Sequence, residues 1–327
     1  MEDGKLKIAI LYRVHPNPYE IEERHVERIR QTAPGAEIIR ARDEGELLSK
    51  TDDADVLLTW GGYQPVAFCG KARSLKWIHA ISAGVDGLLS SDIAKMDVTI
   101  TRTKDIHGIP IANHVLGFML MFVRQFPLMF RQQQNKVWKK TADADELWGK
   151  TVGIIGLGSI GGEIARQCKL LGMRVLATKR TPAQSPWVDE LYPPEQTGEV
   201  FRQADFVVVA LPLTPATTRI IGEKELRLMK KTAYFINIAR GGVVDEDALI
   251  RVLREGAIAG AGLDVFEEEP LPPDSPLWEM PNVIITPHTA ADSPLYMDRM
   301  IEVFCENLKR FIRGEKLLHE VDKNLRY

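Results

Sequence analysis

The alternation of apolar and polar positions along the chain of 327 residues predicts strands and helices in regular succession. In the first hundred residues, short apolar runs indicate strands, and residues 19–31 are predicted to form a charged amphipathic helix. Because strands that alternate with helical patterns are typical of parallel βαβ packing, this region is predicted to be a small α/β domain. The predicted strands lie at 6–12, 37–39, 55–59, 76–80 and 98–101.

The rest of the chain repeats this alternation on a larger scale. A long apolar helical pattern occupies residues 110–131, with Pro110 suited to its first turn, and a polar stretch follows. A last amphipathic helix is predicted at about 294–313. Between them we expect further strands at 205–210, 233–238, 258–263 and 283–286, and helices at 223–229 and 245–255.

The stretch TVGIIGLGSIGGEIARQCKLLGMRVLATKR, residues 151–180, organises the second region. It predicts a buried strand, a helix from Ser159 to about residue 171 closed by Gly172, and a second strand. A GxGxxG motif between a strand and a helix is typical of dinucleotide-binding units, whereas a merely tight turn is the alternative. The pyrophosphate is expected at the helix N-terminus. The predicted cofactor-binding residues here are Gly156, Gly158, Ser159, Ile160 and Gly161.

The residues after the second strand indicate which cofactor is bound. An acidic residue at this place binds the ribose of NAD, and a basic one accommodates the 2′-phosphate of NADP. The chain has Lys179, Arg180 and Thr181 there and no acid. We therefore predict that NADP(H) is preferred and that NAD(H) remains possible; the alternative is that the basic pair is only a solvated strand end.

Composition narrows the function classes. The formal net charge is −3 and there is no basic block, so a nucleic-acid partner is not expected. The most apolar run, 109–123, is interrupted by Pro110, Asn113 and His114 and is too short to cross a bilayer. The N-terminus lacks the pattern of a signal peptide. Few, widely spaced cysteines (Cys69, Cys168 and Cys305) suit a reducing compartment, so we expect a cytoplasmic protein without membrane partners.

Reactive side chains follow three predicted strands of the second region. Arg240 follows the strand in FINIARGG, a group of acids follows the strand in GLDVFEEEP, and His288 follows VIITP. Arginine binds carboxylates in a two-pronged way, and histidine transfers protons near neutral pH when a carboxylate holds its tautomer. Together these groups suit the reduction of a 2-oxo acid, with no metal predicted. Taken singly, each is more typical of a surface charge or a structural loop.

The order of these segments closely resembles that of the D-isomer-specific 2-hydroxyacid dehydrogenases, in particular the NADP-preferring glyoxylate/hydroxypyruvate reductase-like branch. The matching motifs are SAGVDGL (82–88), GIPIANHVLGFML (108–120), VGIIGLGSIG (152–161), ALPLTPATTRIIG (210–222), FINIARGGVVDEDAL (235–249) and AGAGLDVFEEEPLPPDSPLWEMPNVIITPHTA (259–290). Arg240, Glu269 and His288 occupy the places of the family's catalytic residues, and Asp264 that of the aspartate facing the nicotinamide carboxamide. The resemblance also implies that Arg240 binds substrate, that Ala83 and Gly84 offer N–H groups to the substrate carboxylate, and that Pro212 lies along the cofactor.

The resemblance implies an architecture as well. We expect two Rossmann-like domains, each a parallel sheet flanked by helices, with a cleft between them. Residues 1–103 and 292–327 would form the substrate-binding, flavodoxin-like domain, and residues 104–291 the dinucleotide-binding Rossmann domain. A homodimer is expected through the segment from the helix after Pro110 to Trp148. Because the chain ends near residue 327, no appended regulatory domain is expected.

The predicted function is hydride transfer between NADP(H) and a small 2-oxo acid or D-2-hydroxy acid, with reduction of glyoxylate or hydroxypyruvate favoured. The first alternative is an NAD(H)-dependent dehydrogenase of a bulkier D-2-hydroxy acid or of 3-phosphoglycerate. A remote alternative is a cofactor-sensing interaction module without turnover.

Overall fold

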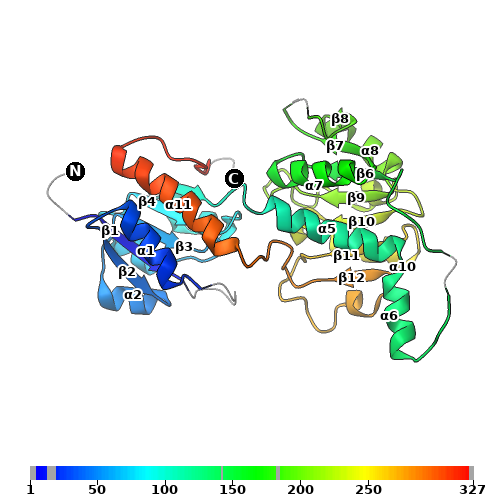
Figure 1. Cartoon of the computed structure of the whole chain (residues 1–327), viewed down its shortest axis with the longest axis horizontal. Coiled ribbons are helices and arrows are strands. Elements are labelled where there is room, and N and C mark those ends of the chain that lie inside the picture. Colours follow the sequence, from blue (N-terminus) through cyan, green and yellow to red (C-terminus); the bar gives the residue numbers. More distant parts are fainter. Residues whose placement is uncertain (1–4, 13–19, 141–142, 182–184, 324–327) are drawn as a thin grey trace. The chain divides into compact units, whose positions relative to one another are not determined.

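The computed structural model describes residues 5–12, 20–140, 143–181 and 185–323 (Figure 1). The chain divides into two compact units, Met1–Ile106 with Ser293–Tyr327, and His107–Asp292. These limits lie beside the domain boundaries predicted from the sequence. The assignment of substrate to the first unit and cofactor to the second stays a prediction.

The first unit is built on a five-stranded parallel sheet with the order β2-β1-β3-β4-β5. This is the flavodoxin-like order. Its central strands β1, β3 and β4 are almost wholly buried because helices cover both faces of the sheet. The strands are β1 (Lys7–Leu11), β2 (Glu37–Ala41), β3 (Val56–Thr59), β4 (Trp77–Ala80) and β5 (Thr99–Arg102).

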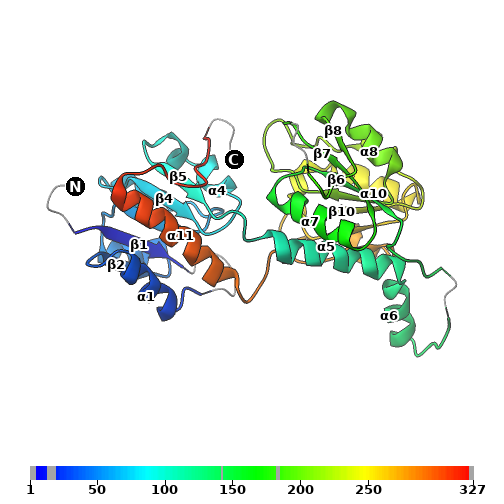
Figure 2. The same cartoon turned by 45° about the horizontal axis from the view of Figure 1, so that its top comes forward.

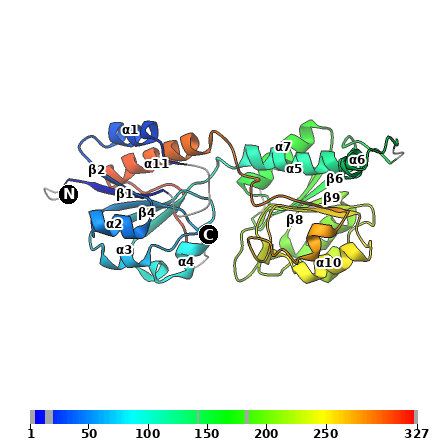
Figure 3. The ribbon, with the colours of Figure 1, turned by 90° about the horizontal axis from the view of Figure 1, so that it is seen from below.

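Figure 3 shows how the helices of the first unit divide between the two faces of its sheet. Helices α1 (Glu23–Thr32) and α11 (Tyr296–Arg313) lie on one face, and they pack on Ile8, Ile10 and Val56. The opposite face packs the other alternate residues, such as Ala9 and Leu57, against shorter helices. These are α2 (Glu44–Lys50), α3 (Val66–Lys71) and α4 (Asp86–Ser90), with the 3₁₀ turn η1 (Asp92–Lys95).

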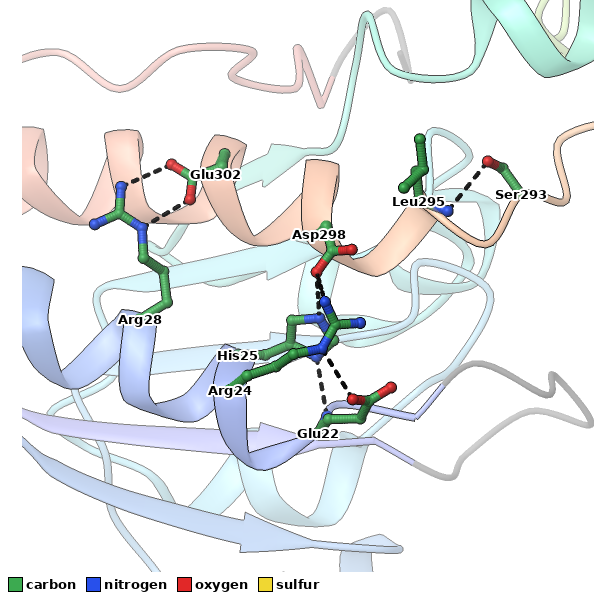
Figure 4. A network of polar contacts seen from close by, with 8 residues as sticks. All are labelled: Glu22, Arg24, His25, Arg28, Ser293, Leu295, Asp298 and Glu302. Atoms are coloured by element: carbon green, nitrogen blue, oxygen red, sulfur yellow. Dashed lines mark hydrogen bonds and ion pairs between the residues drawn. The ribbon is translucent and has the colours of Figure 1, made fainter.

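Polar contacts join α1 to α11, so the C-terminal helix completes the N-terminal unit (Figures 2 and 4). Arg28 donates two hydrogen bonds of 2.7 Å to the carboxylate of Glu302. The buried ring of His25 accepts the backbone N–H of Glu22 at Nδ1, 2.9 Å, and contacts Asp298 through Nε2 at 3.0 Å. Because the N–H of Glu22 occupies Nδ1, the ring proton of His25 lies on Nε2 and is donated to Asp298.

The second unit contains a seven-stranded parallel sheet with the order β12-β11-β10-β9-β6-β7-β8. The chain moves from β6 to β7 on one side and then returns to β9 on the other, so β6 lies at the topological switch point where ligands bind in such sheets. The strands are β6 (Thr151–Ile155), β7 (Arg174–Thr178), β8 (Glu190–Tyr192), β9 (Phe206–Val209), β10 (Tyr234–Asn237), β11 (Gly260–Leu263) and β12 (Val283–Ile285).

Two hydrophobic layers hold this second sheet. One packs α5 (Gly108–Val123) and α7 (Ser159–Leu170) on residues such as Val152 and Val208. The other packs α8 (Thr197–Gln203), α9 (Glu223–Leu226) and α10 (Glu246–Arg254) on residues such as Val207 and Phe235. Three 3₁₀ turns complete the unit: η2 (Pro194–Gln196), η3 (Gly241–Val243) and η4 (Pro276–Glu279).

The structure corrects one predicted element and adds several, among them the short helices α2, α3, α4 and α8. The single helix predicted over 110–131 is two helices, α5 and α6 (Phe126–Gln134), which are bent by 67° relative to each other. Gln125 adopts a left-handed conformation with φ 59° between them, and Pro127 lies in the first turn of α6, where its missing N–H cannot continue α5. The edge strand β8 was not predicted. Residue 19, where the first predicted helix was placed to begin, lies outside the described residues.

Within the described part of the chain, no single helix is both long and apolar enough to cross a membrane. The bent pair α5 and α6 meets the criterion of length and composition when the two helices are taken together. In this structure α5 is a core helix, with Ile111, Val115 and Phe118 buried against the sheet.

Candidate active site

The glycine motif forms a tight connection between β6 and α7. Gly156 has φ +107°, a conformation that side chains rarely adopt, and a Cβ there would lie 2.8 Å from the carbonyl oxygen of Ala210. A Cβ on Gly161 would lie 2.2 Å from the carbonyl oxygen of Gly156, so this glycine lets the helix approach the strand. The hydroxyl of Thr178 accepts the N–H of Gly156 at 3.1 Å and joins the turn to β7.

The surroundings of Gly158 show whether the loop has room for a dinucleotide. A Cβ built on Gly158 meets no atom within 4 Å, so the space beside this backbone is open. The first helical hydrogen bond of α7 runs from the N–H of Gly162 to the carbonyl of Gly158 at 2.8 Å. The N–H groups of Ser159 and Ile160 precede that bond and, together with the helix dipole, favour an anion. The loop therefore fits a pyrophosphate.

The predicted basic pair lies where β7 ends. Lys179 is half-buried and its N–H donates to the carbonyl of Tyr192 at 3.0 Å, whereas Arg180 and Thr181 are exposed. β7 neighbours β6 in the sheet, so the pair follows the strand beside the glycine loop. Pro212, predicted to lie along the cofactor, is exposed after β9, and its carbonyl accepts the hydroxyl of Thr217 at 2.6 Å.

Arg240 is positioned by the turn that follows β10. The side chain of buried Asn237 spans this turn, because it accepts the N–H of Ala239 at 3.1 Å and donates to the carbonyl of Arg240 at 3.2 Å. The guanidinium is half-buried and donates to the carbonyl of Ala239 at 2.7 Å. Gly241 then brings the chain against the backbone of Phe266, in the loop that carries the predicted catalytic acid.

Glu269 and His288 form a direct contact. The Nδ1 of His288 lies 2.6 Å from Oε2 of Glu269, and the other carboxylate oxygen accepts the N–H of Phe266 at 3.0 Å. Burial acts to raise the pKa of Glu269, but these two hydrogen bonds and the positive charges of His288 and Arg240 outweigh it and lower that pKa below its ordinary value. Glu269 is therefore a carboxylate at neutral pH, which fixes the proton of His288 on Nδ1 whenever the ring is neutral.

The two other glutamates of this loop have different surroundings. Glu267 forms a two-pronged ion pair with Arg219, at 2.9 and 3.0 Å, and Glu268 is exposed. Of the three glutamates in the loop, only Glu269 lies within hydrogen-bond distance of His288. The Glu269–Pro270 peptide bond is cis.

Asp264 holds the backbone on both sides of His288. Its carboxylate, 2% exposed, accepts the N–H of Thr289 at 2.9 Å and that of Ala290 at 3.0 Å, and its own carbonyl accepts the N–H of His288 at 2.8 Å. His288 has φ 55°, a left-handed conformation that costs about 1–2 kcal/mol for a residue other than glycine. These hydrogen bonds stabilise that conformation.

In the first unit, the loop predicted to bind the substrate carboxylate is held by its neighbours. The hydroxyl of Ser82 donates to the carbonyl of Gly84 at 2.8 Å and accepts the N–H of Gly61 at 3.0 Å. The guanidinium of Arg102 donates to the carbonyl of Ala83 at 3.4 Å. Because these carbonyls are engaged by side chains, the loop containing Ala83 and Gly84 has a defined conformation.

Sequence reasoning did not find four supporting residues. Two are Ser82 and Asn237, and the others are His114 and Thr286, whose side chains lie 3.0 Å apart, with the hydroxyl of Thr286 donating to Asp264 at 2.6 Å. Each acts through a contact with residues distant in the chain or with a backbone atom in a turn. Ser82, Asn237 and Thr286 lie at or near the ends of strands, whereas His114 lies within helix α5. Among the described residues, no group of three or more histidine, cysteine or acidic side chains is arranged to hold a metal ion.

Comparison with known proteins shows which sequences and folds this chain resembles. A sequence model of the NAD-binding domain of D-isomer specific 2-hydroxyacid dehydrogenases matches residues 116–290. The glyoxylate reductase of Korarchaeum cryptofilum is 36% identical over 252 residues, which are 75% of each chain. The D-3-phosphoglycerate dehydrogenase of Methanocaldococcus jannaschii is 36% identical over 285 residues, 85% of this chain but 54% of that protein. The chain thus spans about half the length of that relative.

A solved structure extends the similarity to almost the whole chain. The NADPH-dependent glyoxylate/hydroxypyruvate reductase of Sinorhizobium meliloti, in complex with NADP and sulfate, superposes with a TM-score of 0.85. It is 29% identical in sequence, and the match covers 99% of this chain and all of that one. The chain therefore belongs to the D-isomer specific 2-hydroxyacid dehydrogenase family of nicotinamide-dependent oxidoreductases.

Proposed function

We propose that this chain reduces a small 2-oxo acid, glyoxylate or hydroxypyruvate, at the expense of NADPH. The observation that carries the proposal is the 2.6 Å contact between His288 and Glu269, on which the charge of Arg240 also acts. The names of the relatives support the substrate class, since they include glyoxylate reductases and an NADPH-dependent glyoxylate/hydroxypyruvate reductase.

The three side chains divide the work of the reduction. Arg240 binds the substrate carboxylate and polarises the keto group. Glu269 holds Nδ1 of His288 and stabilises the protonated ring, so Nε2 is the atom that donates a proton to the keto oxygen. The N–H groups of Ala83 and Gly84 in the first unit are proposed to bind the carboxylate as well. When bound, the nicotinamide supplies the hydride.

The preference for NADPH rests on Lys179, Arg180 and Thr181. A 2′-phosphate requires cations and hydroxyl donors, and no acid at the end of β7 competes with it. The neighbouring hydroxyl of Thr178 is engaged with the N–H of Gly156, so the three residues after it are the candidates for phosphate binding. Asp264 is proposed to contact the nicotinamide carboxamide.

The first experiment measures initial rates with glyoxylate, hydroxypyruvate, pyruvate and a branched 2-oxo acid, each with NADPH and with NADH. NADPH-dependent turnover of the two smallest acids supports the proposal, and preference for NADH overturns the cofactor assignment. Changing Lys179 and Arg180 together to alanine is expected to raise the KM for NADPH about 30- to 100-fold and that for NADH less than about threefold.

A matched control changes Lys230 and Lys231 to alanine; this exposed basic pair precedes β10, at the amino end of that strand. This variant loses the same charge and is expected to keep the KM values of the parent for both cofactors. Equal losses for NADPH and NADH in the Lys179 and Arg180 variant would mean that the pair does not bind the 2′-phosphate.

A second candidate is an NAD(H)-dependent dehydrogenase of 3-phosphoglycerate. The relative from Methanocaldococcus jannaschii carries that name, and Arg102 brings a guanidinium to the proposed substrate loop through its contact with Ala83. Adding 3-phosphohydroxypyruvate to the panel decides between the two, because this candidate requires its turnover with NADH to exceed that of hydroxypyruvate. Tight NADPH binding without turnover of any acid would indicate a sensing module.

A homodimer is proposed through the segment that begins at α5 and continues along α6. No residue of α6 is buried, and Phe126, Met129 and Phe130 are exposed on it. Trp138 is fully exposed and Trp148 is 76% exposed. Apolar side chains gathered in this way are typical of an interface. Light scattering is expected to give the mass of two chains, and Phe130→Asp is expected to give the mass of one.

A cytoplasmic location remains a prediction that rests on cysteine usage. Cys69, Cys168 and Cys305 are free and buried. Burial raises the pKa of Cys69 and that of Cys168 to about 12, so these thiols are protonated and unreactive at neutral pH.

A further inference from the structure

The segment that carries His288 is linked to helix α5 by a hydrogen-bond network of three side chains, Asp264, Thr286 and His114. Thr286, the first residue after β12, donates its hydroxyl proton to Oδ1 of Asp264 at 2.6 Å. Its oxygen lies 3.0 Å from Nε2 of His114, which projects from α5. Since the single hydroxyl proton of Thr286 is given to Asp264, the oxygen accepts, and His114 donates from Nε2.

His114 is suited to this task. Burial lowers its pKa, and the charges of Asp264 and Asp292 only partly oppose that effect, so the ring is neutral at physiological pH. The ring also meets the edge of Phe118, with centroids 4.7 Å apart and an interplanar angle of 89°. Phe118 in turn packs directly on β11, because a Cβ at Gly262 would lie 2.7 Å from its ring. The donor is therefore held rigidly.

Asp264 connects this hydrogen-bond network to His288 and Glu269. The same Oδ1 that receives Thr286 also receives the N–H of Thr289, so both sides of His288 are attached to one buried carboxylate. The backbone of His288 between them is left-handed, a conformation that persists in a residue other than glycine only where its surroundings hold it. A displacement of this segment moves Nδ1 of His288 away from the carboxylate of Glu269.

We propose that Thr286 and His114 are positioning residues, which act through Asp264 to hold the imidazole of His288 against Glu269. The proposal rests on the proposed function for its kinetic consequence, since His288 is there the proton donor. It requires no direct contact of Thr286 or His114 with substrate or cofactor. It assigns them to the rate of the chemical step and not to binding.

The decisive variants are Thr286→Val, which keeps the shape of the side chain and removes the hydroxyl, and Thr286→Ser, which restores it. We expect kcat for hydroxypyruvate with NADPH to fall about 10- to 100-fold in the valine variant. The KM for NADPH and the dissociation constant of NADPH are expected to change less than about threefold. The serine variant is expected to recover most of the lost rate. Thr232→Val, at an exposed position before β10, is the matched control and is expected to keep the kcat of the parent.

A second readout needs neither substrate nor cofactor. The pKa of Glu269 can be followed by the carboxyl ¹³C resonance of glutamate-labelled protein, assigned with Glu269→Gln. The groups that act on this carboxyl are His288, Arg240 and the N–H of Phe266, with Glu246 as a neighbouring acid. Thr286→Val is expected to raise the pKa of Glu269 toward its ordinary value, because the bond from His288 weakens, and Thr286→Ser is expected to leave it unchanged.

The two readouts separate the possible failures. If the parent reduces no 2-oxo acid, the proposed function fails, while the carboxyl titration still decides the positioning role. If Thr286→Val keeps both the kcat and the Glu269 titration of the parent, the positioning role is wrong. If the valine variant does not fold, His114→Leu is used instead, because it removes the last donor of the hydrogen-bond network. It is expected to lower kcat about three- to tenfold, and parental values would overturn the proposal.

Discussion

Gly241 joins the two loops of the proposed catalytic centre, and its replacement by alanine gives a sharp prediction. It directly follows Arg240, and a Cβ there would lie 1.9 Å from the carbonyl carbon and 2.0 Å from the carbonyl oxygen of Phe266. Ordinary contacts begin at 3.4 Å, so the two backbones would have to separate by about 1.5 Å. Because all these atoms belong to the main chain, no change of rotamer relieves the clash.

The size of the effect follows from that displacement. A misplacement of about 1 Å in a catalytic group costs about 10²-fold in rate, and overpacking costs about 1–3 kcal/mol of stability. We therefore expect Gly241→Ala to lower kcat about 100-fold and to lower the melting temperature by a few degrees. The neighbouring variant Gly242→Ala is the control, since its Cβ would meet only the side chain of Leu213 at 3.5 Å, an ordinary contact.

The assay compares kcat/KM for hydroxypyruvate and thermal unfolding in the two variants. If the Gly241 variant keeps a rate within about threefold of the Gly242 variant, the close approach of the two loops is not needed for catalysis, and the reasoning fails. If Gly242→Ala loses as much rate as Gly241→Ala, the effect does not come from the contact with Phe266.

Two further predictions concern other parts of the chain. Gly158→Ala is expected to leave the melting temperature unchanged and to weaken NADPH binding at least about tenfold, because its Cβ enters open space where the pyrophosphate is proposed to lie. The control is Gly162→Ala, whose Cβ also meets no atom and which is expected to bind NADPH as the parent does. Fluorescence titration with NADPH compares the two variants. Burial, assisted by the charge of His319, lowers the pKa of His79 to about 3. Below about pH 6.5, His79 is therefore protonated in the unfolded chain but not in the folded chain. Stability linked to His79 is thus fully present above that pH and is lost as pH falls, by about 2 kcal/mol at pH 5, and urea unfolding of the parent should show a steeper dependence on pH than His79→Gln; equal slopes would contradict the assignment.

Local patterns sufficed where the sequence itself contains the physical determinant. The β6–α7–β7 unit was predicted to within a residue, since β-branched strands, glycines at the turn and Gly172 past the helix each act locally. The break between α5 and α6 shows the limit of periodicity. The apolar pattern continues through it, and only the left-handed backbone at Gln125 and the missing N–H of Pro127 end the first helix. The edge strand β8 has three residues, too few to show an alternation.

The proposed site divides in the same way. Strand-end reasoning led to Arg240 and His288, because the carboxyl ends of parallel strands meet at one edge of the sheet. It did not distinguish Glu269 from its two neighbours, and the resemblance to a family made that choice. The contacts that support these residues could not be predicted from the sequence. His114 and Thr286 are 172 positions apart, and no periodicity relates them.

Asp264 remains the residue for which the two lines of reasoning differ most in emphasis. The resemblance implies a contact with the nicotinamide carboxamide, whereas the structure shows a carboxylate 2% exposed that accepts three hydrogen bonds from the segment around His288. Oδ1 receives two donors and Oδ2 one, so Oδ2 retains a free lone pair and the two roles are compatible.

Asp264→Asn separates these two roles of the carboxylate. The amide keeps one acceptor and turns the other into a donor, which leaves at least one of the three donors without a partner at a cost of about 1–3 kcal/mol. Because all three belong to the His288 segment, we expect kcat to fall at least about tenfold while NADPH affinity stays near that of the parent. The exposed Asp274→Asn is the control. A loss of NADPH affinity with kcat retained would instead make the carboxamide contact the main role of this carboxylate.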